Sequence, residues 1–215
     1  MSDDDVPVLQ LTDVTYLGEP VQDDAEILNE LPEDLRNGLT QVNGFIAFHG
    51  AFHLRGVGNV PEWHSLEAAW KGEHSLAKLF PAVDARDIPF GQDSVGNQYL
   101  LRDGQVLQLS AHWGKVEPLG IGLLAFLAQT SQAPEGLLDA WVLTRFRKDG
   151  HTLEPGKLLN CSPPLWAKAD PAAISIRAIS ALEHVSFLAH VARQISHLPD
   201  GAKVQFEFLN LPVNR

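Results

Sequence analysis

The alternation of apolar and polar residues is clearest between Ile88 and Leu109, where it predicts strand, turn, strand, turn and strand. Val95-Gly96-Asn97 provides a residue that can take a positive φ. Asp103-Gly104 lies between two strand-like runs, and a type I′ hairpin turn needs positive φ at both of its central residues. Because Pro89 cannot donate a ladder hydrogen bond, Pro89 to Asp93 is predicted to be a short edge strand or a loop.

Helical spacing dominates upstream of this stretch. A helix is predicted to start at Pro32, continue to about Val42 and stop at Asn43-Gly44, which can adopt a left-handed cap. Its buried face is predicted to carry Leu35, Leu39 and Val42. Phe45 to Arg55 is rich in aromatic residues around a glycine, and is read as two strands or one bulged strand.

Helical spacing returns at Gly120, and Pro134 is predicted to open a further helix that runs to about Arg147. The last third predicts a strand over Ala173 to Ile179 and a helix opened by a capping box at Ser180 to Glu183. A final strand is predicted to carry Val204, Phe206 and Phe208 on one face. The pattern therefore predicts a partly disordered acidic segment (1–22), a core (23–150) and a strand-helix-strand elaboration (151–215) packed on the same domain.

Three segments resemble the SUKH superfamily, which contains bacterial toxin-immunity proteins and fungal regulators of cell-wall synthesis. The central one has Pro-Phe-Gly ending at Gly91, then Asp93, Gly96 and Asn97, a short strand, and Asp103-Gly104. Leu31 to Phe45 resembles the first helix of the family, and Trp113 to Leu127 resembles its closing strand and following helix. The resemblance covers roughly residues 31–128.

The resemblance implies an α+β fold: a twisted, mainly antiparallel sheet with helices packed against it. It also implies a protein-binding domain without catalysis, which would neutralise a cognate toxin by direct binding in the bacterial cytoplasm. The alternative is a regulatory adaptor for cell-wall synthesis or stress signalling, by analogy with the fungal relatives.

Charge narrows the expected partners. Of a net charge of −11, most lies in residues 1–36, which hold eleven acidic residues against one basic residue. Because phosphate binding needs a basic face, nucleic acid is not expected as a partner, whereas a basic protein toxin is. The first residues lack the basic and apolar regions of a secretory signal, and no apolar run approaches the ~20 residues of a membrane span. A cytoplasmic location without membrane contact is therefore expected.

Candidate catalytic and metal-binding residues are few. Cys161 is the only cysteine and precedes Ser-Pro-Pro, without a Gly-x-Ser-x-Gly elbow anywhere in the chain, so it is expected to pack as a small apolar residue. His49 and His53 lie in a strand-like run, which would place them about 13 Å apart, too far to share one ion. The sequence therefore predicts no enzyme activity, no metal and no cofactor.

The candidate partner contacts are two tryptophans and three polar residues. Trp63, with Glu62 beside it, and Trp113 combine a large aromatic ring with polar neighbours, as interface hot spots do, although each can also be a packing residue. Asp93 and Asn97 can either face a partner or fix their own turn through side-chain to backbone hydrogen bonds. Gly91, Gly96, Asp103 and Gly104 are assigned structural roles in the motif.

Overall fold

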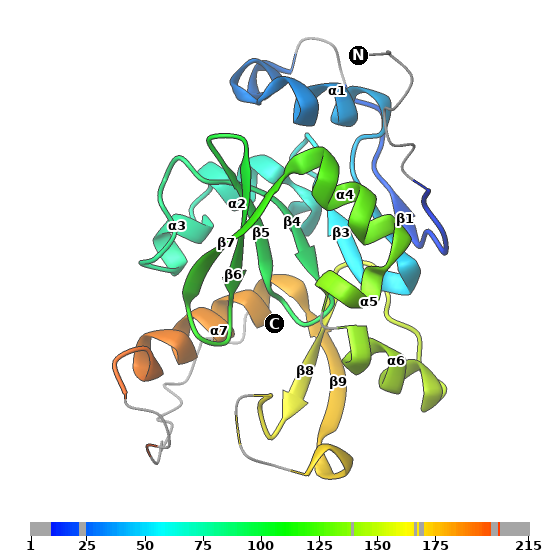
Figure 1. The fold of residues 1–215 in the computed structure, drawn as a ribbon, viewed down its shortest axis with the longest axis vertical. Coiled ribbons are helices and arrows are strands. Elements are labelled where there is room, and N and C mark those ends of the chain that lie inside the picture. The colour runs from blue at the N-terminus through cyan, green and yellow to red at the C-terminus, as the bar shows by residue number, and fades with distance from the viewer. Residues whose placement is uncertain are drawn as a thin grey trace.

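The computed structural model of this protein describes residues 10–21, 25–138, 140–165, 167, 170–198 and 202. The predictions for Met1 to Asp5 and for the strand with Val204, Phe206 and Phe208 lie outside these residues. The described chain is an α+β fold, as the sequence predicts (Figure 1).

The centre of the fold is a seven-stranded sheet in which each strand pairs antiparallel with the next along the chain. Its strands are β1 (Tyr16–Leu17), β2 (Phe45–Ala47), β3 (Phe52–Leu54), β4 (Ile88–Asp93), β5 (Gln98–Arg102), β6 (Gln105–Ser110) and β7 (Lys115–Gly122). A separate antiparallel pair consists of β8 (Lys157–Ser162) and β9 (Ser175–Ser180). The predicted antiparallel sheet is therefore confirmed.

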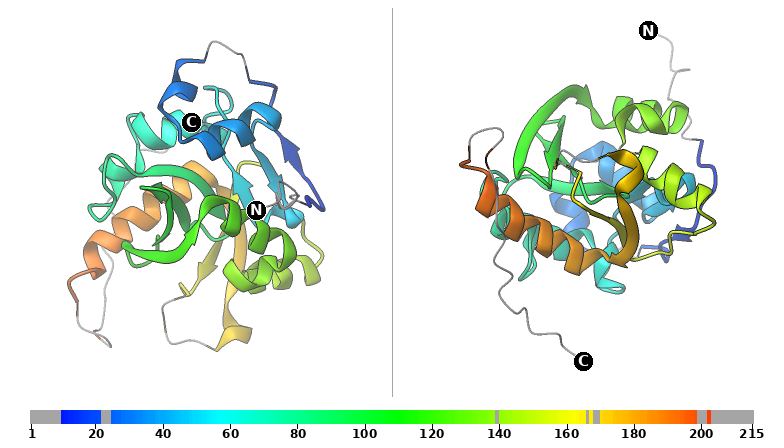
Figure 2. Two further views of the ribbon diagram at one scale, coloured as in Figure 1. Left: turned by 45° about the horizontal axis from the view of Figure 1, so that its top comes forward. Right: turned by 90° about the horizontal axis from the view of Figure 1, so that it is seen from below.

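Helices connect and cover these strands. The α-helices are α1 (Glu33–Gln41), α2 (Leu66–Lys71), α3 (Leu76–Leu79), α4 (Leu123–Gln132), α5 (Pro134–Leu137), α6 (Ala140–Lys148) and α7 (Ala181–Ile195). Short 3-10 turns are η1 (Glu26–Glu30), η2 (Phe48–Gly50), η3 (Glu62–His64) and η4 (Pro171–Ala173). Figures 1 and 2 show α1 at one end of the sheet, α7 running across it, and the β8–β9 pair at the opposite end from α1.

Both faces of the sheet are buried, which the alternation along β5 makes clear. Tyr99 and Leu101 enter one hydrophobic core, where Phe126 of α4 packs its ring 4.7 Å from that of Tyr99. Leu100 points to the opposite face and joins a second core with Leu188 of α7. Since successive residues of a strand face opposite sides, one strand contributes to both cores.

The glycines and the hairpin of the central stretch adopt the predicted geometry. Asp103 and Gly104 both have positive φ (48° and 77°), so the turn between β5 and β6 is of the predicted type. Gly96 has a φ of 99°. A Cβ at Gly91 would lie 2.8 Å from the ring of Phe52 on the neighbouring strand, so this position needs glycine for close approach.

The edge or loop predicted for Pro89 to Asp93 is wrong. These residues belong to β4, which lies between β3 and β5 and is wholly buried. The sheet accommodates the proline by a register shift between Ile88 and Gly91 on the β5 side. A bulge is one of the few places where a central strand tolerates a residue without an amide hydrogen.

Tertiary packing also moves several predicted helix features. Val42 follows α1 and is 38% exposed, whereas Leu35 and Leu39 are buried as predicted. The helix predicted from Gly120 begins at Leu123 instead, because β7 continues through Gly122 to pair with β6. The helix predicted from Pro134 to about Arg147 is two helices, since Leu138 has an extended backbone and is buried.

In the C-terminal part, the predicted strand over Ala173 to Ile179 is β9 and the predicted helix is α7, and β8 precedes them as an additional strand; the predicted final strand lies outside the described residues. Helix α7 starts at Ala181 as predicted, but the Ser180 side chain makes no capping hydrogen bond. This part packs on the core at two glycines. A Cβ at Gly96 would lie 2.9 Å from Leu188 of α7, and one at Gly156 would lie 2.8 Å from the Trp63 indole.

Candidate functional site

The Asp93 carboxylate organises the turn between β4 and β5. One oxygen, Oδ1, accepts hydrogen bonds from the backbone amides of Val95, Gly96 and Asn97 at 2.9–3.0 Å. The other oxygen, Oδ2, accepts a hydrogen bond from Asn97 Nδ2 at 2.8 Å. Asp93 is only 1% exposed, so its carboxylate binds groups of the turn and not solvent. This geometry matches the turn-fixing alternative.

Asn97 links this turn to the turn that follows β6. Its Oδ1 accepts a hydrogen bond from the Ala111 amide at 3.2 Å, and it is 3% exposed. The turn that Ala111 opens contains Trp113, whose own amide donates to the Ser110 carbonyl at 3.0 Å. The two polar residues of the central motif therefore position the loop that presents Trp113.

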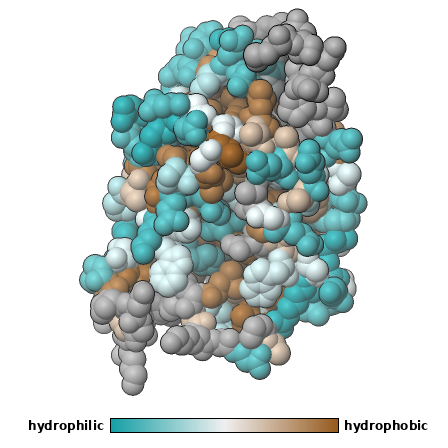
Figure 3. Space-filling view, viewed as in Figure 1, coloured by the Kyte–Doolittle hydropathy of each residue, from teal (hydrophilic) through white to brown (hydrophobic). Residues whose placement is uncertain are grey.

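Trp113 lies on the rim of a surface cavity of about 590 Å³, which we call the tryptophan hollow. It is lined by Asn97, Gln108, Ser110, His112, Trp113, Glu135, Gly136, Leu138, Trp141 and Leu165. Trp113 and Trp141 are 42% and 47% exposed although they come from different segments, the turn after β6 and helix α6. Figure 3 shows the face of the molecule seen in Figure 1, where apolar and near-neutral surface is interspersed among hydrophilic side chains.

The structure places Glu62 and Trp63 elsewhere. Both line a second cavity of about 170 Å³, which we call the arginine pocket. Its lining is Arg55, Glu62, Trp63, Ser65, Ala68, Ala69, His74, Leu76, Leu79, Gln92, Ala181, Leu182, Val185 and Ser186. The Trp63 ring also packs edge-on against Tyr16, with centroids 4.9 Å apart. Of the predicted contacts, Asn97 and Trp113 thus share one site, Glu62 and Trp63 share another, and Asp93 lines neither.

A buried polar network forms the floor of the arginine pocket. His53, Gln92 and Gln98 are directly paired across β3, β4 and β5, so their side chains share one face of the sheet. Arg55 is 4% exposed and donates to four neutral oxygens: the carbonyls of Pro89 (3.0 Å) and Gly91 (3.2 Å) and the side chains of Gln92 (2.9 Å) and Gln98 (2.6 Å). These bonds tie the bulged part of β4 to its neighbours.

The network continues through two histidines. Because Gln92 Oε1 accepts from Arg55, its Nε2 donates to His53 Nδ1 at 3.1 Å. His53 Nε2 then donates to His64 Nδ1 at 2.9 Å, and His64 Nε2 donates to the Asn43 carbonyl at 3.0 Å. This direction of donation requires both imidazoles to be neutral. Burial, with help from Arg55, lowers the pKa of both His53 and His64, in agreement with that assignment.

Burial also lowers the pKa of Arg55, to about 9, so the guanidinium remains charged at neutral pH. Sequence reasoning did not identify this network. The signal that was available is the recurrence of polar residues at alternate strand positions, at His53 and Arg55, in runs that otherwise consist of core residues.

His184 of α7 provides a test of these burial effects. It is 1% exposed, and burial, reinforced by His112, lowers its pKa to about 4 from 6.5. Between these two values the unfolded chain binds a proton that the folded chain does not, so stability falls as the pH falls. At pH 5 we expect His184 to remove about 2 kcal/mol of unfolding free energy relative to pH 7.5. Urea unfolding at both pH values measures this.

A matched pair of variants isolates that effect. In His184→Gln, the loss of unfolding free energy between pH 7.5 and pH 5 is expected to be smaller by about 2 kcal/mol. In His197→Gln, at an exposed position, the loss is expected to equal that of the unsubstituted protein. If His184→Gln retained the slope of the unsubstituted protein, the assignment to His184 would be wrong.

Metal-ligating and nucleophilic groups are dispersed in the described part of the chain. Within those residues, no group of three or more His, Cys, Asp or Glu side chains is arranged to hold a metal ion. His49 and His53 are not on one strand, because His49 belongs to the 3-10 turn η2 and His53 to strand β3. Cys161 is buried in the hydrophobic core, and burial raises the pKa of its thiol to about 11. No helix among the described residues is long and apolar enough to span a bilayer.

Comparison with known proteins adds evidence on the fold. No family model matches this sequence, and no curated protein matches it. Among solved structures, the fold is similar to that of Atu4351 from Agrobacterium tumefaciens, with a TM-score of 0.53 and 16% sequence identity over 82% of this chain and 85% of that chain. At this identity the similarity establishes a shared α+β fold, and the SUKH resemblance stays a prediction.

Proposed function

We propose that this protein is a non-catalytic protein-binding domain that neutralises a cognate toxin by direct contact in the bacterial cytoplasm. The tryptophan hollow is the proposed contact surface. The single observation that carries the proposal is the pair of half-exposed rings, Trp113 and Trp141, at the rim of one cavity. The resemblance of the central motif to SUKH immunity proteins gives the expected class of partner.

The chemistry of the hollow suits protein recognition. Tryptophans are the side chains most often found as energetic anchors in protein interfaces, because each buries a large apolar area and retains one hydrogen-bond donor. The amide of Gln108 and the hydroxyl of Ser110 line the same cavity and can pair with a partner's backbone. The Asp93 and Asn97 hydrogen bonds hold the Trp113 turn in place, which limits the ordering cost of binding.

The charge distribution favours a basic toxin. Acidic residues of η1 and α1, including Glu26, Glu30, Glu33 and Asp34, lie at the end of the molecule opposite β8 and β9 (Figure 1). The negative electrostatic potential at this end orients an incoming basic protein and raises its association rate. Since salt screens such fields, the association rate is expected to fall as ionic strength rises.

The interface assignment predicts a loss of affinity when either tryptophan is truncated. Trp113→Ala and Trp141→Ala are each expected to weaken toxin binding by about 30-fold or more, equivalent to about 2 kcal/mol. The candidate toxin is the product of the adjacent reading frame, purified and titrated in a calorimeter. Because both rings are about half exposed, each variant should unfold within about 1 kcal/mol of the unsubstituted protein.

A distant apolar residue provides the control. Leu17 on the edge strand β1 is 59% exposed, and Leu17→Ala is expected to leave toxin affinity unchanged. Full affinity in both tryptophan variants would refute the hollow as the contact surface. Catalytic turnover by the purified protein alone would refute the proposed binding function itself.

A further inference from the structure

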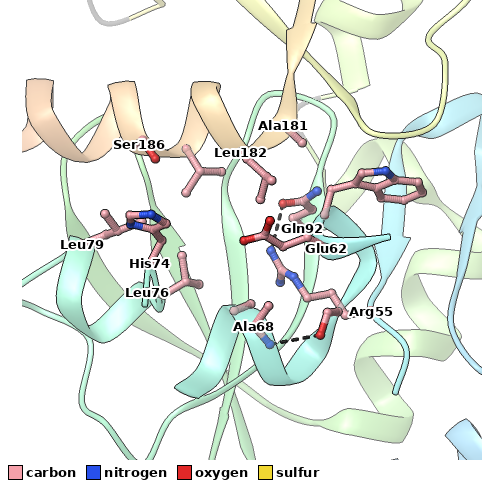
Figure 4. A pocket seen from close by; sticks show the side chains of 14 residues that line it. Arg55, Glu62, Ala68, His74, Leu76, Leu79, Gln92, Ala181, Leu182 and Ser186 are labelled. Atoms are coloured by element: carbon pink, nitrogen blue, oxygen red, sulfur yellow. Dashed lines mark hydrogen bonds between the residues drawn. The ribbon is translucent and has the colours of Figure 1, made fainter. Parts of the chain in front are cut away.

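The arginine pocket is lined by charged and apolar residues that take no part in the proposed toxin contact. It lies between the sheet, helices α2 and α3, and α7 (Figure 4). Figure 4 shows Glu62 and Gln92 beside the Arg55 guanidinium at one end, His74 and Ser186 at the other end, and Leu182 between them. The cavity of about 170 Å³ is several times what one water molecule requires, so it has room for a small organic molecule.

Arg55 brings a positive charge to this pocket and forms no salt bridge with any described residue. The four hydrogen bonds that its terminal nitrogens donate all go to neutral oxygens, and they use both hydrogens on each of these nitrogens. Nε–H has no acceptor among the described residues, and within those residues no carboxylate lies within 4.0 Å of the guanidinium. A buried charge without a direct ion pair is costly, so contact between Arg55 and an anionic group of a ligand would be favourable.

Glu62 places a second, opposite charge at the same end of the pocket. It is exposed and forms no ion pair with any described residue, and Figure 4 shows its carboxylate on the same side as Arg55. A purely anionic ligand would be repelled by this carboxylate. A ligand that carries an anion and a cation on neighbouring atoms would satisfy both residues.

Apart from Ser65, His74 and Ser186, the remaining walls are apolar. They consist of Ala68 of α2, Leu76 and Leu79 of α3, and Leu182 and Val185 of α7. These side chains line the cavity beyond its charged end. A fitting ligand therefore has an aliphatic or aromatic group attached to its two charged groups.

We propose that the arginine pocket binds a free α-amino acid with an apolar side chain. Its carboxylate lies against Arg55, its ammonium group lies against Glu62, and its side chain contacts Leu76, Leu182 and Val185. This binding is independent of the tryptophan hollow, because the two cavities share no lining residue. The amino acid is a ligand, and the proposal includes no chemical step.

A panel of four compounds tests the recognition chemistry. Leucine is titrated into the full chain up to roughly 10 mM and followed by calorimetry and by amide shifts in NMR spectra. Leucinamide lacks the carboxylate, isocaproate lacks the ammonium group, and glycine lacks the apolar body. Each is expected to bind at least about tenfold more weakly than leucine. Absence of leucine binding, or equal binding of leucinamide or isocaproate, would overturn the proposal.

Exposed wall residues allow variants that keep the fold. Glu62→Gln is expected to weaken leucine binding by about tenfold or more with an unchanged melting temperature, while the nearby exposed Glu73→Gln binds normally. Leu182→Trp is expected to fill the cavity and abolish binding, whereas Leu124→Trp, at a residue that is also 43% exposed, keeps it. Normal leucine binding by Glu62→Gln and Leu182→Trp would refute the site. Trp113→Ala should bind leucine normally even if toxin binding is lost.

Discussion

Asp93→Asn is expected to lower the free energy of unfolding by about 3 kcal/mol or more. The carboxylate accepts three backbone amide hydrogen bonds and one from Asn97 Nδ2 in an environment where it is 1% exposed. An asparagine at this position has one acceptor oxygen, and its amide nitrogen would face another donor. The loss therefore combines weakened charge-assisted bonds with a buried donor that has no acceptor. Urea unfolding measures it.

An aspartate outside any such turn provides the comparison. Asp34 is exposed in the first turn of α1, and Asp34→Asn is expected to cost a few tenths of a kcal/mol through the helix dipole. A loss below about 1 kcal/mol for Asp93→Asn would mean that the turn does not depend on the carboxylate.

Arg55→Met is expected to cost about 3–5 kcal/mol, because it removes the donor to two backbone carbonyls and to the Gln98 side-chain oxygen, and leaves the Gln92 oxygen with only the longer bond from Gln98 Nε2 (3.3 Å). The carbonyls of Pro89 and Gly91 belong to the bulged part of β4, where the regular ladder to β5 is interrupted. The guanidinium is thus part of what allows a proline in a central strand. Chemical denaturation and thermal melting both measure the loss.

An exposed arginine on a strand is the matched control. Arg177 of β9 is exposed, so Arg177→Met is expected to change stability by no more than about 0.5 kcal/mol. If Arg55→Met were as stable as Arg177→Met, the carbonyls at the bulge would have to find other donors, and the assigned role of Arg55 would be wrong.

These two residues stabilise the fold and also shape its two cavities. Asp93 and Asn97 hold the turn that presents Trp113, and Arg55 forms the charged end of the other pocket. Partial loss of function in their variants must therefore be separated from partial unfolding. For this reason the functional tests rest on Trp113, Trp141, Glu62 and Leu182, whose side chains are more exposed.

Local features of the chain were predictable from the sequence. Asp103-Gly104 and Gly96 are recognisable because only a few residue types adopt positive φ readily, and this constraint acts within one turn. The period of two along the central strands predicts the strands of the meander, whereas the α+β class was what the resemblance to the SUKH superfamily implied. The sequence does not resolve the two cores, since a run such as Tyr99 to Leu101 indicates that both faces are buried without showing which helix covers each.

The turns, the strand periods and the central motif follow from the local sequence, because they depend on the conformational preferences of neighbouring residues. The packing of distant segments, in contrast, makes β4 a central strand, places Trp113 and Trp63 in different cavities and buries the Arg55 cation. The Arg55 hydrogen bonds join residues that are 34 to 43 positions apart. Such contacts follow from the register and packing of distant strands, which no local pattern specifies.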